Sequence, residues 1–273
     1  MHAWIFLNIK DIAMLTENER LQAVETLLQA QRECRQAKLL TDSFPHIQIE
    51  DSYAISTAVM QRKVAAGAKL IGHKVGLTSK AMQASSKINE PDYGYLLDNM
   101  LIAEGAKVPH ASFCLPRVEI ELAFVLGQPL KGPGVTLTDV LRATEYVVPA
   151  LEIVDARLVD QRKIQDTIAD NGAAAGLVLG GRPVRPLDVD LRWVGGLMYR
   201  NSEIEETGVA AGVLGHPALG VAWLANKLGQ HGVGMEAGHI VLAGSFTRVV
   251  FAKKGDTLFG DFGSLGSVCV QFV

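Results

Sequence analysis

Three glutamates lie in stretches of the sequence that otherwise have the composition of buried β-strands. Glu119 and Glu121 belong to the run Val-Glu-Ile-Glu-Leu-Ala-Phe-Val-Leu (118–126), and alternation along a strand places both side chains on one face. Glu152 is the only charged residue in the apolar run 147–154. An ionised carboxylate is costly to bury unless it is paired, protonated or bound to a cation. Two interpretations therefore stay open: a solvent-exposed strand face, which commonly carries glutamates, or a cation site.

If the three carboxylates share a cation, their chemistry favours a hard divalent ion. A set of carboxylates without His or Cys suits Mg²⁺ or Mn²⁺ and leaves coordination positions open for a chelating substrate. The seven histidines are dispersed, and the three cysteines, Cys34, Cys114 and Cys269, are far apart. No CxxC or HExxH sequence occurs, so neither a zinc site nor a disulfide framework is predicted.

A lysine in an unusual setting is a second candidate for chemistry. Lys74 lies between Gly72 and Gly76, in a strand-like segment that leads to the hydroxyl of Thr78. Glycines on both sides let another group approach the backbone closely. Such a lysine could transfer a proton or bind a carboxylate, and a surface lysine in a turn is the alternative. Downstream, the segment Glu-Pro-Asp-Tyr-Gly is typical of a β-turn, and its local chemistry gives Asp92 no role.

Several classes of function are disfavoured by the composition. Lys and Arg total 26 against 29 for Asp and Glu, and this net charge of −3 is not that of a nucleic-acid or polybasic membrane-surface binder. The aromatic residues (3 Trp, 5 Tyr and 9 Phe) are too few and too scattered for a base-stacking platform. No GxGxxG, Walker or GxSxG sequence occurs, which disfavours nucleotide cofactors and serine hydrolysis.

The elements that must position these residues begin with helices. Thr16 and Glu19 form a capping box at the start of a helix predicted over 16–37, and a second helix is predicted from about 51 to 66. Short β-type runs then take over, separated by turns rich in Gly and Pro. We expect strands over residues 69–77, 118–126, 146–154, 176–179, 239–243, 248–252 and 267–273, with helices near 136–145 and 217–228. This order predicts an α+β fold with a helical layer on a mostly β core.

The domain organisation is simple. A chain of 273 residues, 48% of them hydrophobic, can bury one large core, and no repeat or linker-like stretch divides it. Residues 16–273 are therefore predicted to form a single catalytic domain, preceded by an N-terminal extension over 1–15. The apolar start of that extension is interrupted by Lys10 and Asp11 and lacks the features of a signal peptide. It is also too short to span a bilayer, so we expect a cytoplasmic protein with no membrane segment.

Several motifs follow one another along the chain and together resemble one family. They are Gly-His-Lys-Val-Gly-Leu-Thr-Ser-Lys, Glu-Pro-Asp-Tyr-Gly, Pro-Arg-Val-Glu-Ile-Glu, Pro-Ala-Leu-Glu-Ile-Val-Asp-Ala-Arg, Ile-Ala-Asp-Asn, Gly-His-Pro-Ala, Gly-Ser-Phe-Thr and Gly-Ser-Leu-Gly-Ser. The family is that of the 2-oxopent-4-enoate hydratases and 4-oxalocrotonate decarboxylases, within the fumarylacetoacetate hydrolase superfamily. The resemblance runs from about residue 20 to Val273, more than nine-tenths of the chain.

The resemblance implies a fold and a metal site. The expected fold is a mixed β-sandwich roll like the C-terminal domain of fumarylacetoacetate hydrolase, with the N-terminal helices as a flanking layer. The expected metal is a divalent ion, usually Mg²⁺ with Mn²⁺ as an alternative, held by three acidic side chains. The positions that match the family's ligands are Glu119, Glu121 and Glu152, which strand alternation singles out independently.

The resemblance also implies roles in proton transfer and substrate binding. Lys74 and Asp92 fall where the family has its proton-transfer groups. Beside an anionic cluster a lysine should stay charged, so Lys74 suits a donor or carboxylate anchor and Asp92 is the better base. Thr78 and Ser245 are candidates for hydrogen bonds to the substrate, with purely structural roles as the alternative.

Within the family, the segments around Lys74 and over 199–208 resemble the branch that hydrates 2-oxohept-4-ene-1,7-dioate, and Lys80 fits this branch as well. The tautomer of this substrate is 2-hydroxyhepta-2,4-diene-1,7-dioate, an intermediate of homoprotocatechuate (4-hydroxyphenylacetate) degradation. The implied reaction protonates C5, adds water at C4 and protonates C3, which gives 4-hydroxy-2-oxoheptanedioate.

Alternatives to this activity stay open. They are hydration of 2-hydroxypenta-2,4-dienoate, decarboxylation of a 4-oxalocrotonate-type substrate, fumarylpyruvate-type hydrolysis, and the role of an inactive partner subunit in a hydratase/decarboxylase complex. The expected ligand is a small 2-oxo-enoate diacid, with no nucleic acid or membrane partner. The family implies a large homo-oligomer such as a decamer of paired pentamers.

Overall fold

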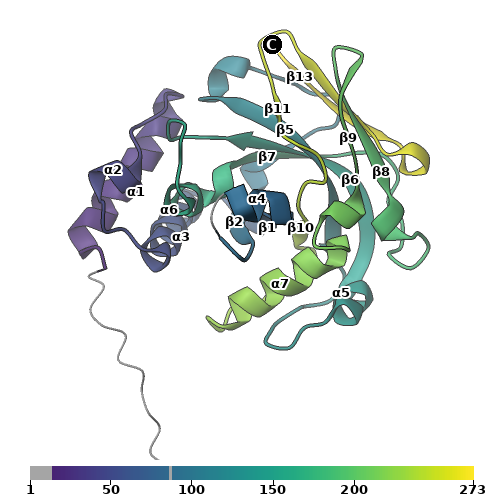
Figure 1. The fold of residues 1–273 in the computed structure, drawn as a ribbon, viewed down its shortest axis with the longest axis horizontal. Coiled ribbons are helices and arrows are strands. Elements are labelled where there is room, and N and C mark those ends of the chain that lie inside the picture. Colours follow the sequence, from purple (N-terminus) through teal and green to yellow (C-terminus); the bar gives the residue numbers. More distant parts are fainter. Residues whose placement is uncertain (1–13, 86–87) are drawn as a thin grey trace, which may run out of the picture.

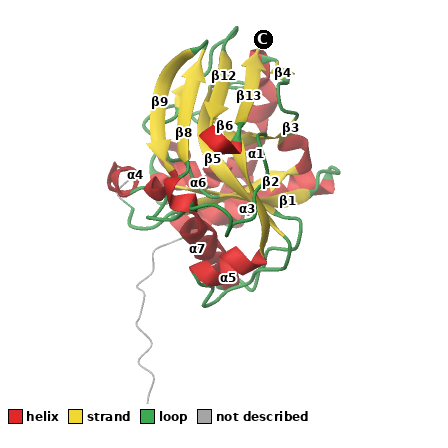
Figure 2. Cartoon of the chain, turned by 90° about the vertical axis from the view of Figure 1, so that its right-hand side faces the viewer, coloured by secondary structure: helices red, strands yellow, loops and turns green. Residues whose placement is uncertain are grey.

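The computed structural model describes residues 14–85 and 88–273. Two β-sheets pack face to face, and the N-terminal helices gather on the other face of the larger sheet (Figure 1). Turned by a quarter, the molecule shows the smaller sheet at the top and the helices over Leu137–Ala143 and Pro217–Gly229 near the bottom (Figure 2). This mixed β-sandwich with an N-terminal helical layer confirms the α+β fold predicted from the sequence.

The larger sheet has the strand order β2-β1-β10-β5-β6-β7-β3, with β11 paired to β5. Its strands are β1 Leu70–Gly76, β2 Asp92–Leu97, β3 Leu101–Ile102, β5 Pro116–Leu126, β6 Thr144–Asp155, β7 Ala174–Leu179, β10 Ile240–Leu242 and β11 Val250–Phe251. The smaller sheet has the order β4-β13-β12-β8-β9. Its strands are β4 Lys107–Val108, β8 Gly195–Arg200, β9 Glu203–Val209, β12 Thr257–Asp261 and β13 Ser267–Phe272.

The described part of the chain contains seven α-helices, of which α1, α3 and α7 are the longest. Their bounds are α1 Glu17–Glu33, α2 Leu40–Ser43, α3 Ile49–Ala65, α4 Lys80–Ser85, α5 Leu137–Ala143, α6 Ile164–Ala169 and α7 Pro217–Gly229. None of them combines the length and apolar composition that a crossing of the bilayer requires.

One hydrophobic core fills the space between the two sheets. Ile120, Leu122 and Phe124 from one face of β5 pack in the same cluster as Val268 and Val270 of β13, and all five are fully buried. Removing such side chains from water is worth about 1.5–3 kcal/mol each, so this cluster fixes which face of β5 points inward. The other face, which carries the glutamates, must then point toward the helical layer.

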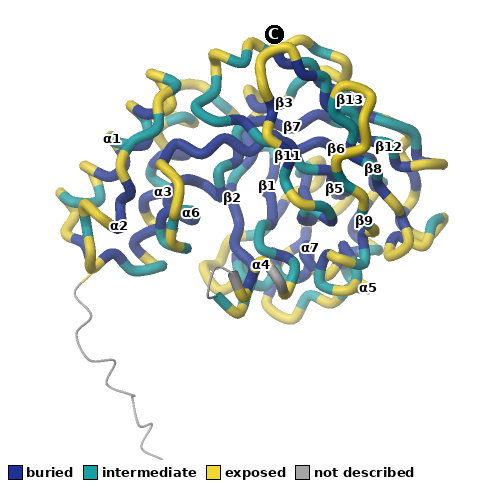
Figure 3. Tube along the Cα trace, turned by 45° about the horizontal axis from the view of Figure 1, so that its top comes forward, coloured by how far each residue is buried: buried dark blue, intermediate teal, exposed yellow. Residues whose placement is uncertain are grey.

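A second core lies between that other face and the N-terminal helices. Ala123 and Val125 of β5 belong to one cluster with Val24 of α1 and with Ile55 and Val59 of α3. The central strands are consequently buried on both faces, while the outer sides of α1 and α2 remain exposed (Figure 3). The glutamate face of β5 is therefore an interior surface.

Most predicted elements are confirmed with shifted ends. The capping box forms as expected: Thr16 accepts the backbone N–H of Glu19 at 3.3 Å, and the Glu19 carboxylate accepts the N–H of Thr16 at 2.8 Å. The first helix ends earlier than predicted, because Cys34 adopts a left-handed backbone with φ 47°. The helix predicted over 51–66 is α3, and the one predicted over 217–228 is α7.

The β-turn predicted for Glu-Pro-Asp-Tyr-Gly is wrong. Asp92 begins strand β2, which pairs antiparallel with β1 along its whole length. Pro91 directly precedes this strand, where the missing N–H costs no ladder bond, and Gly94 serves a close backbone contact rather than a turn. Of the predicted extension, residues 1–13 lie outside the described part. Leu15 is buried, and its N–H donates to the Asp51 carboxylate at 3.2 Å.

Candidate active site

Glu119, Glu121 and Glu152 form one cluster at the middle of the larger sheet. Antiparallel pairing of β5 with β6 puts Glu119 directly opposite Glu152, and Glu121 follows two residues along the same face. One carboxylate oxygen from each side chain lies within 4.8 Å of the other two. Adjacent strands and the two-residue period of a strand are therefore sufficient to bring the three acids together.

Burial decides between the two interpretations of these glutamates. Glu121 and Glu152 are 0% exposed, so an open strand face is ruled out for them. Among the described residues, Glu121 Oε1 and both Glu152 oxygens are buried and have no hydrogen-bond partner. Buried carboxylate oxygens without donors are what a hard cation requires as ligands. The residues present thus fit a divalent metal ion.

The electrostatics of the cluster also favour a bound cation, because the three carboxylates repel one another. Burial raises the pKa of Glu119, raises that of Glu121 well above its usual range, and raises that of Glu152 to about 7. Repulsion from the neighbouring glutamates adds to the effect at Glu121 and Glu152, while Lys74 opposes it. Protons and a cation therefore compete for the same oxygens, and cation binding should release protons.

A backbone donor fixes one member of the cluster. The N–H of Gly244 donates to Glu121 Oε2 at 2.8 Å, which leaves Oε1 as the buried oxygen without a hydrogen-bond partner among the described residues. Gly244 has φ 118°, and a Cβ at this position would lie 2.4 Å from Thr78 Oγ1. Only glycine allows this approach, so Gly244 both orients Glu121 and lets Thr78 pack against the cluster.

Lys74 is buried beside the glutamates and is not a surface residue of a turn. It lies in β1 with 4% of its surface exposed, and Nζ is 3.6 Å from Glu152 Oε1. Burial acts to lower the pKa of Lys74, but the carboxylates of Glu152, Asp92 and the other two glutamates outweigh it and raise the pKa. The surrounding carboxylates therefore favour the ammonium form of the side chain, which is the form that the sequence predicted.

Asp92 lies next to Lys74, which the sequence alone could not show. The pairing of β1 with β2 places Asp92 opposite Gly76, and a Cβ on Gly76 would lie 2.1 Å from Asp92 Oδ1 and 3.2 Å from Lys74 Nζ. Burial raises the pKa of Asp92, with Lys74 opposing the shift. Glycine at position 76 thus leaves the space in which a buried acid and a buried ammonium ion face each other.

The two predicted substrate-binding hydroxyls differ in their surroundings. Thr78 is 4% exposed and borders the cluster through its contact with Gly244. Ser245 directs its hydroxyl to backbone carbonyls, at 3.3 Å from Ile120 and 3.0 Å from Thr247. The Ser245 hydrogen is thus already used within the protein, whereas Thr78 Oγ1 packs against Gly244, whose N–H binds Glu121.

One neighbour of the site received no role from the sequence. Asn171, from the Ile-Ala-Asp-Asn motif, contacts the backbone of β2 through its side chain, and Gly172 packs against Lys74. The motif itself was the only available signal, because nothing local to it indicates which strand it meets.

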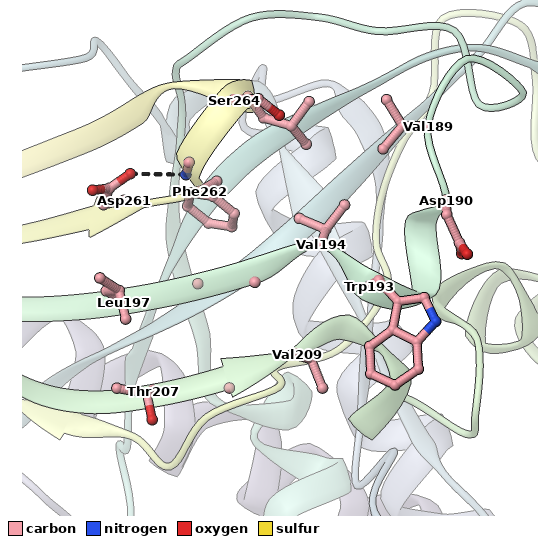
Figure 4. Close-up of a pocket in the computed structure, with 15 residues that line it drawn as sticks. Val189, Asp190, Trp193, Val194, Leu197, Thr207, Val209, Asp261, Phe262 and Ser264 are labelled. Carbon is pink, nitrogen blue, oxygen red and sulfur yellow. Dashed lines mark hydrogen bonds between the residues drawn. The ribbon is translucent and has the colours of Figure 1, made fainter.

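A surface pocket of about 820 Å³ lies elsewhere, on the smaller sheet. Val194 and Leu197 from the β8 region, Val209 at the end of β9 and Phe262 after β12 line it, with Trp193 at its rim (Figure 4). None of the seven predicted site residues lines this pocket. The pocket has two acids of its own, Asp190 and Asp261, whereas the three glutamates and Lys74 gather in the buried cluster.

Comparison with known proteins agrees with this fold. The model of the fumarylacetoacetate (FAA) hydrolase C-terminal family matches residues 63–273. The chain is 54% identical over 267 residues to the 2-oxo-hept-4-ene-1,7-dioate hydratase of Escherichia coli, covering 95% of this chain and 100% of that protein. It is 41% identical over 258 residues to the 2-hydroxyhexa-2,4-dienoate hydratase of Comamonas testosteroni, covering 92% and 98% of the two chains.

A solved structure is similar over nearly the whole fold. The 4-oxalocrotonate decarboxylase from Pseudomonas putida G7, complexed with magnesium and adipate, superposes with a TM-score of 0.92 at 35% identity. The match covers 95% of this chain and 99% of that one. The chain therefore belongs to the fumarylacetoacetate hydrolase family, in the group that contains these 2-oxo-enoate hydratases and decarboxylases.

Proposed function

We propose that this protein is a divalent-metal-dependent hydro-lyase that adds water to 2-oxohept-4-ene-1,7-dioate and forms 4-hydroxy-2-oxoheptanedioate. The observation that carries the proposal is the buried cluster of three glutamates with Lys74 at 3.6 Å from one of them. The 54% identity to a hydratase with this substrate name supports the choice of substrate, and it exceeds the 35% identity to the 4-oxalocrotonate decarboxylase of known structure.

The proposed metal ligands are Glu119, Glu121 and Glu152, with Mg²⁺ as the ion and Mn²⁺ as an alternative. Carboxylate oxygens match the preference of both ions, and the P. putida decarboxylase was solved with magnesium. A bound divalent ion would supply positive charge for the carboxylate and 2-oxo oxygens of the substrate. The protein contributes the fixed ligand positions, since β5 and β6 are buried on both faces.

Two side chains of the protein, Lys74 and Asp92, are proposed to move protons. The Lys74 ammonium is proposed to donate a proton to the carbon chain of the dienol, because its buried surroundings keep it charged. Asp92 is proposed to accept a proton from the water that adds at C4, because it faces the same space beside Gly76. Thr78 is proposed to hydrogen-bond the substrate at the edge of the cluster, and Ser245 is proposed to shape the loop that holds Gly244.

The site draws on β1, β2, β5, β6 and the loop after β10, so residues 16–273 are proposed to act as one catalytic domain. A decameric assembly and a cytoplasmic location stay predictions from the family resemblance. The role of an inactive partner subunit is disfavoured, because the acids and the lysine of the site are all present and lie together.

Product analysis separates hydration from the other reactions of this family. Purified protein with Mg²⁺ is given 2-hydroxyhepta-2,4-diene-1,7-dioate, and the loss of ultraviolet absorbance is followed together with the product mass. We expect a product heavier by one water and no release of CO₂. A parallel incubation with a 4-oxalocrotonate-type substrate is the control. If CO₂ is released from the 4-oxalocrotonate-type substrate and 2-hydroxyhepta-2,4-diene-1,7-dioate is not hydrated, the protein is a decarboxylase and not a hydratase. Cleavage of the substrate into two fragments would indicate hydrolysis.

A further inference from the structure

The strand that carries Asp92 lies at the edge of the larger sheet. In the sheet order β2 has a neighbouring strand on one side only, namely β1. On its other side the side-chain amide of Asn171 takes the place of a strand: the Tyr95 N–H donates to Asn171 Oδ1 at 2.7 Å, and Asn171 Nδ2 donates to the Tyr95 carbonyl at 3.0 Å. One carboxamide thus pairs with both polar groups of one residue of β2.

The contact requires a close approach of two backbones. A Cβ on Gly94 would lie 2.4 Å from the carbonyl oxygen of Asn171, so only glycine allows the loop to reach β2 here. Gly94 is also the register partner of Lys74 in β1. The Asn171 loop therefore meets the sheet at the level of the catalytic lysine and two residues from Asp92.

The loop that presents Asn171 is strained and firmly held. Asn171, Gly172 and Ala173 have φ values of 57°, 58° and 60°, a left-handed turn that non-glycine residues rarely adopt. Such strain persists when the surroundings determine the conformation. Here Asp170 is bound by the buried guanidinium of Arg157, with 2.5 Å between Nε and Oδ1.

The same turn contacts Lys74 directly. A Cβ on Gly172 would lie 3.2 Å from Lys74 Nζ and 3.3 Å from its Cδ, so the turn forms one wall of the lysine's pocket. The turn therefore contacts the lysine on one side and the strand of Asp92 on the other.

We propose that Asn171 is a positioning residue of the active site: its amide fixes the edge strand β2 and thereby sets the position of Asp92 relative to Lys74. The expected effect of Asn171 on catalysis rests on the proposed function, whereas its expected effect on the position of β2 does not. Asn171 itself is buried, and its polar atoms are turned to Tyr95 and, at 3.4 Å, to the Ser56 hydroxyl.

The chain contains a matched control. Asn226 makes the same pair of bonds to Val135, accepting its N–H at 2.8 Å and donating to its carbonyl at 2.9 Å, on α7 and away from the site. The experiment compares Asn171→Ala with Asn226→Ala in the full chain with Mg²⁺. It measures kcat and KM for the heptadiene substrate, Mg²⁺ affinity by calorimetry, and hydrogen–deuterium exchange of the peptides that contain Tyr95 and Val135.

For Asn171→Ala we expect faster exchange in β2 and a fall in kcat of about 10²-fold, the size of effect associated with a misplacement on the order of 1 Å. KM and Mg²⁺ affinity should stay near the wild-type values, because the metal ligands lie on β5 and β6. For Asn226→Ala we expect faster exchange around Val135 and unchanged kcat. Replacement of a residue that serves stability alone would not lower kcat while leaving KM near the wild-type value.

Two results would overturn the inference: wild-type kcat in Asn171→Ala despite faster exchange in β2, or an equal loss of kcat in Asn226→Ala. If Asn171→Ala does not fold, Asn171→Asp replaces it. This variant keeps an acceptor for the Tyr95 N–H but places a carboxylate oxygen against the Tyr95 carbonyl. It should also lower kcat without changing KM, and the fall in kcat should be smaller than for Asn171→Ala. Absence of hydratase activity in the wild type would instead overturn the proposed function, and the exchange data would still report whether Asn171 holds β2.

Discussion

Replacement of Glu121 by glutamine is expected to abolish Mg²⁺ binding and hydratase activity together. Glutamine keeps the shape of the side chain and an acceptor for the Gly244 N–H at 2.8 Å, so the fold around it should be retained. What is lost is one of the negative charges that a divalent ion needs in this buried site. Because that charge repels Glu152 and Glu119, the metal-free variant should unfold at the same or a higher temperature than the metal-free wild type.

The measurements are calorimetric titration with Mg²⁺, the rate of diene consumption, and thermal unfolding in EDTA. Glu145→Gln is the matched control, because Glu145 lies on the same strand as Glu152 but is exposed. It should bind Mg²⁺ and turn over substrate like the wild type. Normal Mg²⁺ affinity in Glu121→Gln would show that the cluster is not the metal site, and a lower unfolding temperature in EDTA would show that the carboxylate is needed for the fold.

Replacement of Lys74 by methionine is expected to separate catalysis from metal binding. Methionine fills a similar volume without the ammonium group that is proposed to donate the proton. We expect a loss of activity of about 10²–10⁴-fold, the range of general acid–base contributions. Mg²⁺ should bind more tightly than to the wild type, because a positive charge 3.6 Å from Glu152 no longer repels the cation.

The control for this variant is Lys69→Met, which removes an exposed lysine directly before β1. It should leave both Mg²⁺ affinity and rate unchanged. If Lys74→Met retained the wild-type rate, Lys74 would not be the donor. If it lost Mg²⁺ binding along with activity, the ammonium group would serve the architecture of the cluster rather than proton transfer.

The three-glutamate cluster is the part of the candidate site that local sequence predicts best. Strand alternation over 118–126 places Glu119 and Glu121 on one face, and the apolar context of Glu152 marks it as unusual. Alternation is identical for an exposed and a buried face, however, so it could not decide between them. That decision depends on α1 and α3, which come from a distant part of the chain and cover the glutamate face.

The contacts of Asp92 and Asn171 could not be predicted from their neighbours in sequence. Pro91 and Gly94 give the Asp92 segment the composition of a turn, and only pairing with β1 makes it a strand opposite Gly76. Asn171 acts on a residue 76 positions away. Long-range pairing of this kind has no local pattern, which explains why the family resemblance located Asp92 whereas the composition of its segment did not.

The most direct test of metal-dependent hydration is a Mg²⁺ titration of EDTA-treated, dialysed protein, with binding and hydration followed in the same samples. The three-glutamate site predicts no hydration of 2-hydroxyhepta-2,4-diene-1,7-dioate before Mg²⁺ is added. It further predicts that the rate then rises in proportion to the fraction of protein with bound Mg²⁺, and that Glu121→Gln shows neither change. Full activity in the metal-free protein would contradict the account.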